Sequence, residues 1–309
     1  MHRYILKRLA MLIFVILGVS FLIFSTMSLA PGDLALTVVG IDASDEEYEA
    51  MREELGLNDP LLVRYARYMK NLLQGDLGYS YQFKMGVWEL YMKRLPATAM
   101  LAFAAMVVAH VISIPLGIYA ALRRGSIRDN IASGVSIIGL AAPNFWVGLM
   151  LIIVFSLNLG WFNSGGYKSL EDIVLPAITV GTGLTALLTR TTRSSMIDVL
   201  SQDYLMLARA KGLSEKKVIR KHALKNAIIP IITISGLEFC SCLGGSVVTE
   251  TVFAWPGIGQ LVINAIKNND FETVTGAIIM TSIMTSIILL LVDILYAFVD
   301  PRIKAQYSK

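Results

Sequence analysis

Charged residues are scarce in this chain of 309 residues, at 16% against the ~25% that is usual for soluble domains. Hydrophobic residues reach 55%, above the ~45–50% of soluble domains, and they occur in long blocks. A bilayer core ~30 Å thick needs about 20 mostly apolar residues per helix. The composition therefore indicates a membrane protein, and the net charge of +4 is no sign of nucleic-acid binding in such a chain.

Cysteine and histidine are also rare, which argues against disulfides and metal sites. Cys240 and Cys242 are two residues apart in one apolar stretch, so on a helix their side chains point apart and a disulfide between them is not expected. The three histidines are scattered, and no Cys/His cluster has metal-ligand spacing. We interpret His110 as a core residue with satisfied hydrogen bonds, and we predict no metal site.

Motifs for catalysis and nucleotide binding are missing. The sequence contains no G-x-x-x-x-G-K-[ST] loop, no G-x-S-x-G elbow and no H-E-x-x-H. No two apolar segments carry closely spaced carboxylates at matching depth, which an intramembrane hydrolase would need. The sequence therefore predicts no catalytic residue and no ATP site on this chain.

Six apolar segments predict an all-α, polytopic membrane protein with about six transmembrane helices. They are Leu9–Ala30, Thr98–Leu122, Ile131–Leu157, Ile173–Leu188, Ala227–Val248 and Val274–Val299. The first is longer than a signal-peptide core and no A-x-A site follows, so we interpret it as a retained helix. Thr189 and Thr191 are able to extend the short fourth segment, because threonine can bond back to its own helix. Kinks are expected at Pro115, Pro143 and Pro176.

The positions of the cations predict the orientation. Three cations precede the first helix, three lie between the second and third, nine lie between the fourth and fifth, and three follow the sixth. The loops on the other side, between helices three and four and between five and six, hold only Lys168 and Lys267. The positive-inside rule therefore places both termini in the cytoplasm.

Residues 31–97 form a long loop that is expected outside, since long loops translocate largely regardless of charge. The pattern at Ser44–Glu47 is a capping box, and Gly56 is a suitable stop for the helix that it begins. Pro60 begins a second helical segment that Gly75 ends. Two interpretations remain open: a cap packed on the membrane end of the chain, or part of a docking surface for an external partner.

The most informative stretch is the loop between the fourth and fifth helices. Tyr204, Leu207 and Lys211 share one helical face, and Gly212 is suited to turn the chain. A second helical stretch follows from Ser214, so a helix–turn–helix on the cytoplasmic surface is expected. The small residues beside the turn would let another protein approach the backbone. The alternative is a basic loop held against anionic lipid, worth ~1 kcal/mol per cation.

Ala208-Arg209-Ala210-Lys211-Gly212, with His222, Asn226 and Pro230 after it, resembles the EAA loop of bacterial ABC-importer permeases. Further pieces resemble the first permease of the dipeptide/oligopeptide/nickel branch, in the same order along the whole chain. These pieces are Ala30–Asp33, Leu55–Pro60, Gly75–Gly78, Glu250–Gly259 and Asp300–Arg302. The resemblance implies a type I ABC importer permease fold in the bacterial cytoplasmic (inner) membrane.

The resemblance also implies partners and a division of the chain. Residues 1–97 would be an N-terminal helix plus external loop, and residues 98–309 a five-helix core with a cytoplasmic coupling loop at 190–227. Residues 208–212 would couple to the ATPase. Met206 stands where the family has its name-giving glutamate, so coupling would depend on the shape of this loop and on Arg209 and Lys211. The expected partners are two ABC ATPase subunits that bind the ATP, a second homologous permease in a heterodimer, an extracytoplasmic substrate-binding lipoprotein or periplasmic protein, and membrane lipid. Neither a nucleic-acid partner nor a cofactor on this chain is expected.

The solute implied by the resemblance is a di- or oligopeptide, with a nickel complex or glutathione as alternatives in the same branch. An ion-coupled carrier or channel is the alternative from a different class. The candidate residues of the translocation path or gate are Glu238, Glu250, Trp255, Pro256 and Gly257. An ionisable group at membrane depth is a functional candidate. Glu238, where the family more often has an amide, either faces the path and attracts an amine, or is protonated or paired. Glu250 is interfacial, and is either structural or part of an outer gate.

Overall fold

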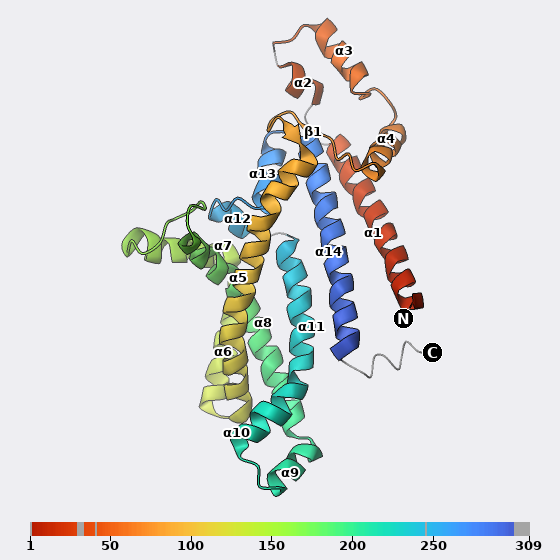
Figure 1. Ribbon diagram of the computed structural model, residues 1–309. Coiled ribbons are helices and arrows are strands. Elements are labelled where there is room, and N and C mark those ends of the chain that lie inside the picture. Colours follow the sequence, from red (N-terminus) through yellow and green to blue (C-terminus); the bar gives the residue numbers. More distant parts are fainter. Residues whose placement is uncertain (1, 30–33, 41, 245, 300–309) are drawn as a thin grey trace. The chain divides into compact units, whose positions relative to one another are not determined.

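The structure of the chain is a computed structural model that describes residues 2–29, 34–40, 42–244 and 246–299. The chain packs as two compact units, residues 1–98 with 256–287 and residues 99–255 with 288–309. Apart from one two-stranded hairpin, the secondary structure of the described residues is helical (Figure 1). The predicted all-α class is therefore confirmed. Two motif pieces, Ala30–Asp33 and Asp300–Arg302, lie outside the described residues.

The first unit holds the N-terminal helix, the long loop and parts of two further helices. Its elements are α1 (His2–Leu29), α2 (Leu34–Val39), α3 (Asp45–Glu54), α4 (Leu61–Leu73), β1 (Tyr79–Ser80), β2 (Met85–Gly86), the start of α5 (Val87–Leu122), α13 (Ile258–Lys267) and most of α14 (Phe271–Val299). The two strands pair antiparallel with Tyr79 opposite Gly86. Tyr91, Ile258 and Ala277 form its buried core, and the Ile258 N–H donates to the Thr98 hydroxyl at 2.8 Å.

The two helices expected in the long loop are α3 and α4. Ser44 caps α3: the Glu47 N–H donates to its hydroxyl at 3.3 Å, and its own N–H donates to the Glu47 carboxylate at 3.0 Å. These hydrogen bonds from Ser44 favour the charged carboxylate and lower the pKa of Glu47. Gly56 follows α3 with φ +63° and Gly75 follows α4 with φ +85°. The predicted capping box and both glycine stops are therefore confirmed.

Helix α4 packs on α1 within this unit. The Tyr65 hydroxyl lies 2.8 Å from the Ser20 hydroxyl, and the Tyr65 ring stands edge-on to Phe21 with centroids 5.2 Å apart. Aromatic pairs in this geometry stabilise beyond their buried area. The packing of α4 is that of a cap on the chain's own N-terminal helix.

The second unit holds the remaining helices. Its elements are the rest of α5, α6 (Ile127–Ala141), α7 (Asn144–Leu151), the π-helix η1 (Ile152–Asn158), the 3₁₀ turn η2 (Leu170–Ile173), α8 (Val174–Leu200), α9 (Asp203–Ala210), α10 (Glu215–Lys217), the π-helix η3 (Val218–Ala223), α11 (Leu224–Leu243), α12 (Val247–Val252) and the end of α14. Ala105 and Ala109 of α5 are buried with Leu184 and Leu188 of α8 and Ile231 of α11. Alanines on α5 let the larger side chains of its neighbours fill the space between the helices.

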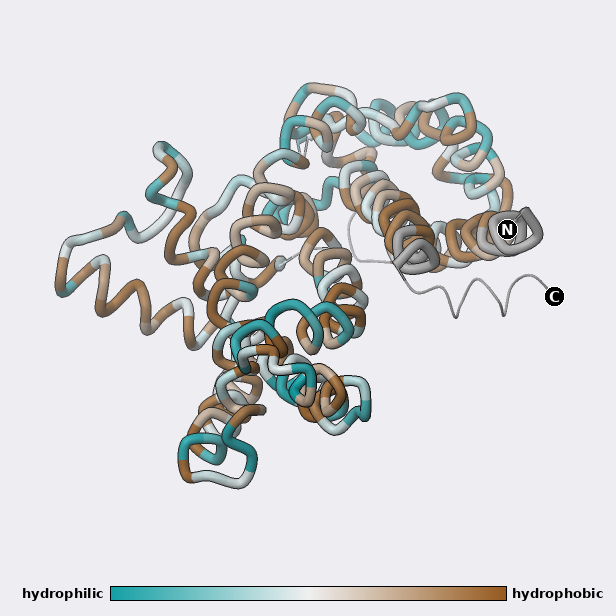
Figure 2. The backbone as a smooth tube through the Cα atoms, turned by 60° about the horizontal axis from the view of Figure 1, so that its bottom comes forward, coloured by the Kyte–Doolittle hydropathy of each residue, from teal (hydrophilic) through white to brown (hydrophobic). Residues whose placement is uncertain are grey.

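Within the described residues, five helices are long and apolar enough to cross a membrane, and a sixth span is formed only if a bent pair is counted. In Figure 2 hydrophobic residues cover most of the long helices, whereas hydrophilic ones gather at turns such as the loop that holds α9 and α10. The bent pair is Ile127–Ala141 with Asn144–Asn158, at 99°.

The expectation of one continuous third segment, Ile131–Leu157, is therefore wrong. Helix α6 ends at Ala141, and Ala142 adopts an extended conformation with ψ 123°. The following residue is Pro143, which precedes the first turn of α7. A proline disfavours the helical conformation of the residue before it, so the chain turns at this point instead of only kinking.

The fourth segment is longer than the apolar run alone indicated. Helix α8 continues to Leu200, and the Thr191 hydroxyl donates to the Leu187 carbonyl at 3.0 Å. The expected extension past Leu188 is confirmed, but of the two threonines only Thr191 makes the expected bond back to the helix. The fifth span also starts earlier than expected, because the helical stretch from Glu215 runs through η3 into α11.

Candidate coupling loop and translocation path

The loop between α8 and α11 turns sharply at Gly212. Helix α9 ends at Ala210, and Gly212 adopts φ +78° with its N–H donating to the Arg209 carbonyl at 2.9 Å. An added Cβ at this glycine would meet no atom within 4 Å. The requirement for glycine is therefore conformational, since only glycine adopts positive φ at little cost.

One face of α9 is buried in the loop's own core. Leu205 and Ala208 pack in a cluster with Met196, Val218 and Ala223. Ala208, whose small size was expected to admit a partner, thus lies against the chain itself, whereas Arg209, Ala210, Lys211 and Gly212 are exposed. The buried face holds α9 in place on the helices around it.

The other face of α9 is apolar and exposed. Tyr204 and Leu207 lie on it, and Met206, at the position of the family's glutamate, has 65% of its surface exposed. The Asn226 amide donates to the Tyr204 hydroxyl at 2.7 Å, which ties α9 to the start of α11. An exposed apolar face on a braced helix is the surface that a docking partner would cover.

Arg209 makes its ion pair inside the loop. Its Nε donates to the Glu215 carboxylate at 2.6 Å across the Gly212 turn, and both side chains are exposed. Such an exposed pair contributes about 0–1 kcal/mol. Lys211 lies at the turn itself as the C-terminal cap residue of α9.

Glu238 lies half-buried on α11, close in sequence to a polar contact between two helices. The His110 ring on α5 is within 2.7 Å of both the Met106 carbonyl and the Ser235 hydroxyl of α11. Both ring nitrogens therefore have partners, which confirms the interpretation of His110 as a satisfied core residue. Among the described residues, no group of three or more metal-ligating side chains comes together.

Glu250 lies in α12, and Trp255 lies in the turn that follows this helix. Both are 0% exposed, and the Trp255 N–H donates to the Glu250 carbonyl at 2.8 Å. The Trp255 ring packs against the Tyr167 ring at a tilt of 50° with centroids 4.7 Å apart. Ala254, directly before Trp255, adopts φ +46°. Pro256 and Gly257 follow at the start of the α13 segment in the first unit, where Gly257 is the N-cap residue.

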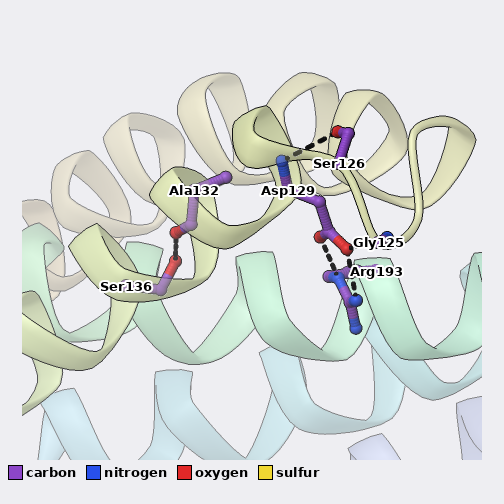
Figure 3. Close-up of polar contacts among 6 residues, drawn as sticks. All are labelled: Gly125, Ser126, Asp129, Ala132, Ser136 and Arg193. Atoms are coloured by element: carbon purple, nitrogen blue, oxygen red, sulfur yellow. Dashed lines mark hydrogen bonds and ion pairs between the residues drawn. The ribbon is translucent and has the colours of Figure 1, made fainter.

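A buried ion pair between α6 and α8 was not expected from the sequence. Asp129 accepts hydrogen bonds from Arg193 Nε at 2.5 Å and Nη2 at 2.7 Å, and from the Gly125 N–H at 2.9 Å (Figure 3). Ser126 caps α6 by accepting from the Asp129 N–H at 3.3 Å. The Ser-x-x-Asp spacing was a signal for the cap, but nothing in the sequence pointed to the partner 64 residues away.

Comparison with known proteins identifies the family. The family described as "Binding-protein-dependent transport system inner membrane component" matches residues 113–305, and the corresponding N-terminal family matches residues 1–102. The chain is 43% identical to the oligopeptide transport system permease protein AppB of Bacillus subtilis (strain 168), over 98% of this chain and 100% of the relative.

Two further relatives carry other transport names. The chain is 36% identical to the dipeptide transport system permease protein DppB of Escherichia coli (strain K12), over 98% of this chain and 99% of the relative. It is 38% identical to the glutathione transport system permease protein GsiC of the same strain, with the same coverage.

A solved structure shares the fold. A chain of the inward-facing MetNI methionine ABC transporter superposes with a TM-score of 0.59 at 18% identity, over 69% of this chain and 97% of that chain. A permease component of this family is a transport subunit without an ATPase domain or a cofactor of its own, and its partners are ATPases and a binding protein. The chain therefore belongs to the binding-protein-dependent transport system inner membrane components, and it is the multi-pass permease subunit of a bacterial ABC importer.

Proposed function

We propose that the chain is one half of a permease pair that imports di- or oligopeptides, driven by two ATPase subunits. The observation that carries this proposal is the 43% identity to an oligopeptide permease over essentially the full length of both chains. The glutathione permease at 38% is a second candidate, and glutathione is itself a small peptide with a free amine and carboxylates. The second permease of the pair is taken to be a homologous but different chain.

The division of labour within the chain follows from this proposal. Residues 98–309 form the permease core, and residues 1–97 are the appended helix and external loop. The loop at 190–227 couples to the ATPase through the exposed face of α9 and the turn formed by Arg209–Gly212. When the ATPase dimer closes on ATP, it moves this loop, and the membrane helices change from inward- to outward-facing.

The proposed orientation, with both termini in the cytoplasm, predicts where a cysteine label reaches the chain. In Lys216→Cys, an impermeant thiol reagent should label position 216 only from the cytoplasmic side. Lys168→Cys, a matched exposed lysine in the loop before η2, should be labelled only from outside. The native Cys240 and Cys242 are buried and so give a low background. Labelling of position 216 from outside in intact cells would reverse the topology.

The solute is tested by uptake into proteoliposomes that hold the complete complex with its binding protein. A labelled dipeptide should accumulate only with ATP, and unlabelled dipeptide should compete more strongly than glutathione. Omitting the second permease should abolish uptake. Uptake of glutathione but not of the dipeptide would mean that the chain is a glutathione permease. Uptake without the ATPases would favour an ion-coupled carrier.

The same uptake assay tests the role of Glu238. We propose that its carboxylate lines the path and attracts the solute's ammonium group. Glu238→Gln should then slow uptake of a free-amine peptide by about tenfold, the order of one charge-assisted hydrogen bond. An N-acetylated peptide should be unaffected by the change. An equal loss for both peptides would assign Glu238 a structural role instead.

A further inference from the structure

A pocket of about 250 Å³ lies between α5, α6 and α8, at the end of α8 that leads to α9. None of its lining residues belongs to α9 or to the residues proposed for the path. Its lining combines two guanidinium groups and several hydroxyl groups with aliphatic side chains of α6. The ligand that fits such a pocket has one charged and one apolar part.

The charged side of the pocket is built around Arg193. Two N–H groups of its guanidinium donate hydrogen bonds to Asp129, which is 2% exposed (Figure 3). This pairing fixes the plane of the guanidinium. A guanidinium has five N–H donors in a rigid fork, so others remain for a ligand. Arg190, one helical turn away, lines the same pocket and is exposed, and it makes no hydrogen bond or ion pair with any described residue.

The floor of the pocket contains a buried hydroxyl without a partner. Thr189 is 2% exposed, and its hydroxyl makes no hydrogen bond within the described part of the chain. Three other threonines of α8, Thr179, Thr182 and Thr191, bond back to the carbonyl four residues earlier at 2.8–3.0 Å. Thr185 and Thr192 lack a partner among the described residues as Thr189 does, but of these three only Thr189 lines the pocket. A buried polar group is normally hydrogen-bonded, so the Thr189 hydroxyl is the group in this pocket that most needs a ligand oxygen.

The apolar side of the pocket opens onto an exposed strip of α6. Ile137 and Leu140, three residues apart on one face of the helix, line the pocket, and both are exposed. Arg123, Arg124 and Arg128 lie at the same end of the span, which is the level of the lipid headgroups. A free anion would leave the aliphatic strip uncovered, whereas an acyl chain would cover it.

We propose that this pocket binds an anionic phospholipid of the cytoplasmic leaflet. The phosphate lies between Arg190 and Arg193 and accepts a hydrogen bond from Thr189, and an acyl chain follows α6 past Ile137. The lipid would bridge α6 and α8 close to the loop that receives force from the ATPases. The leaflet rests on the proposed orientation, which the Lys216→Cys labelling tests independently.

The experiment measures lipid retained by the complete complex, purified from nanodiscs that contain phosphatidylcholine and phosphatidylglycerol. Native mass spectrometry should find phosphatidylglycerol bound to the wild type. Arg190→Gln should weaken this binding about fivefold, the factor expected for one cation at an anionic lipid. Thr189→Val, which keeps the shape and removes the hydroxyl, should weaken it as well. Arg128→Gln is the matched control, because Arg128 donates to the Tyr119 hydroxyl at 3.3 Å and does not line the pocket.

Four outcomes would overturn the proposal. Equal losses in Arg190→Gln and Arg128→Gln would mean general attraction to the surface, and no loss in Arg190→Gln would mean no site. Displacement of the lipid by inorganic phosphate alone would make the pocket a free-anion site. Crosslinking of Leu140→Cys to the second permease in the assembled complex would show that protein, not lipid, covers the pocket.

Discussion

Replacing Gly212 by valine should abolish most ATP-driven uptake while the complex still inserts and assembles. Gly212 adopts φ +78° between α9 and the helix that continues into α11. For a β-branched residue this conformation costs about 1–2 kcal/mol and is rarely adopted, so the turn should reopen. Because α9 carries the proposed docking face, its displacement should lower the uptake rate about tenfold or more. The measurement is solute uptake beside the ATPase activity of the same preparation.

The matched control is a different substitution at the same position, by a residue that adopts positive φ more readily than valine. Asparagine tolerates positive φ better than other non-glycine residues, so Gly212→Asn should retain much of the uptake that Gly212→Val loses. No atom lies within 4 Å of an added Cβ here, so a steric clash does not explain a difference between the two variants. Normal ATP-driven uptake in Gly212→Val would count against the assignment of this turn to coupling.

Removing the Asp129 carboxylate should destabilise the second unit by about 1–3 kcal/mol, the usual cost of leaving a hydrogen-bonded charged group without its partner when that group still reaches solvent. Asp129 accepts three hydrogen bonds, two from Arg193 and one from the Gly125 N–H. In Asp129→Ala the Arg193 guanidinium, only 29% exposed, is left without its partner. The turn between α5 and α6 also loses its connection to α8. Thermal unfolding of the purified complex in one detergent would measure the change.

An exposed pair in the same chain serves as the control. Glu89 and Lys93 form a pair at 2.9 Å on the surface of α5, with 61% and 56% of their side chains exposed. Glu89→Ala should change the stability by at most about 0.5 kcal/mol, since solvent already screens that pair. Equal shifts for the two alanine variants would contradict the structural role given to Asp129.

Features that depend on near neighbours in the chain were predicted well from the sequence. The capping box at Ser44 and the glycines that end α3 and α4 were confirmed, because caps and positive-φ turns depend on a few adjacent residues. The positive φ expected of Gly212 was likewise confirmed. Five of the six spans follow from the length of apolar runs, which the thickness of the bilayer sets. The motif order along the chain predicted the family that the comparisons confirm.

The effect of the proline in the third apolar segment was underestimated. Pro143 was expected to kink a continuous helix, but the chain bends by 99° between Ala141 and Asn144. A proline permits either outcome, and the packing of α7 on α8 and α12 decides between them. The apolar run alone does not show in which direction the chain continues after α6 ends at Ala141.

The residues alone were enough to predict the apolar segments, the two helices of the loop after the first span, the glycine turn at 212 and the family. The packing of the folded chain was needed to learn which side chains meet: Asp129 with Arg193, Trp255 with Tyr167, and Ala208 with the core beneath α9. The difference comes from separation along the chain. Caps and turns are made by residues a few positions apart, whereas these contacts join residues that only the packing of whole helices brings together.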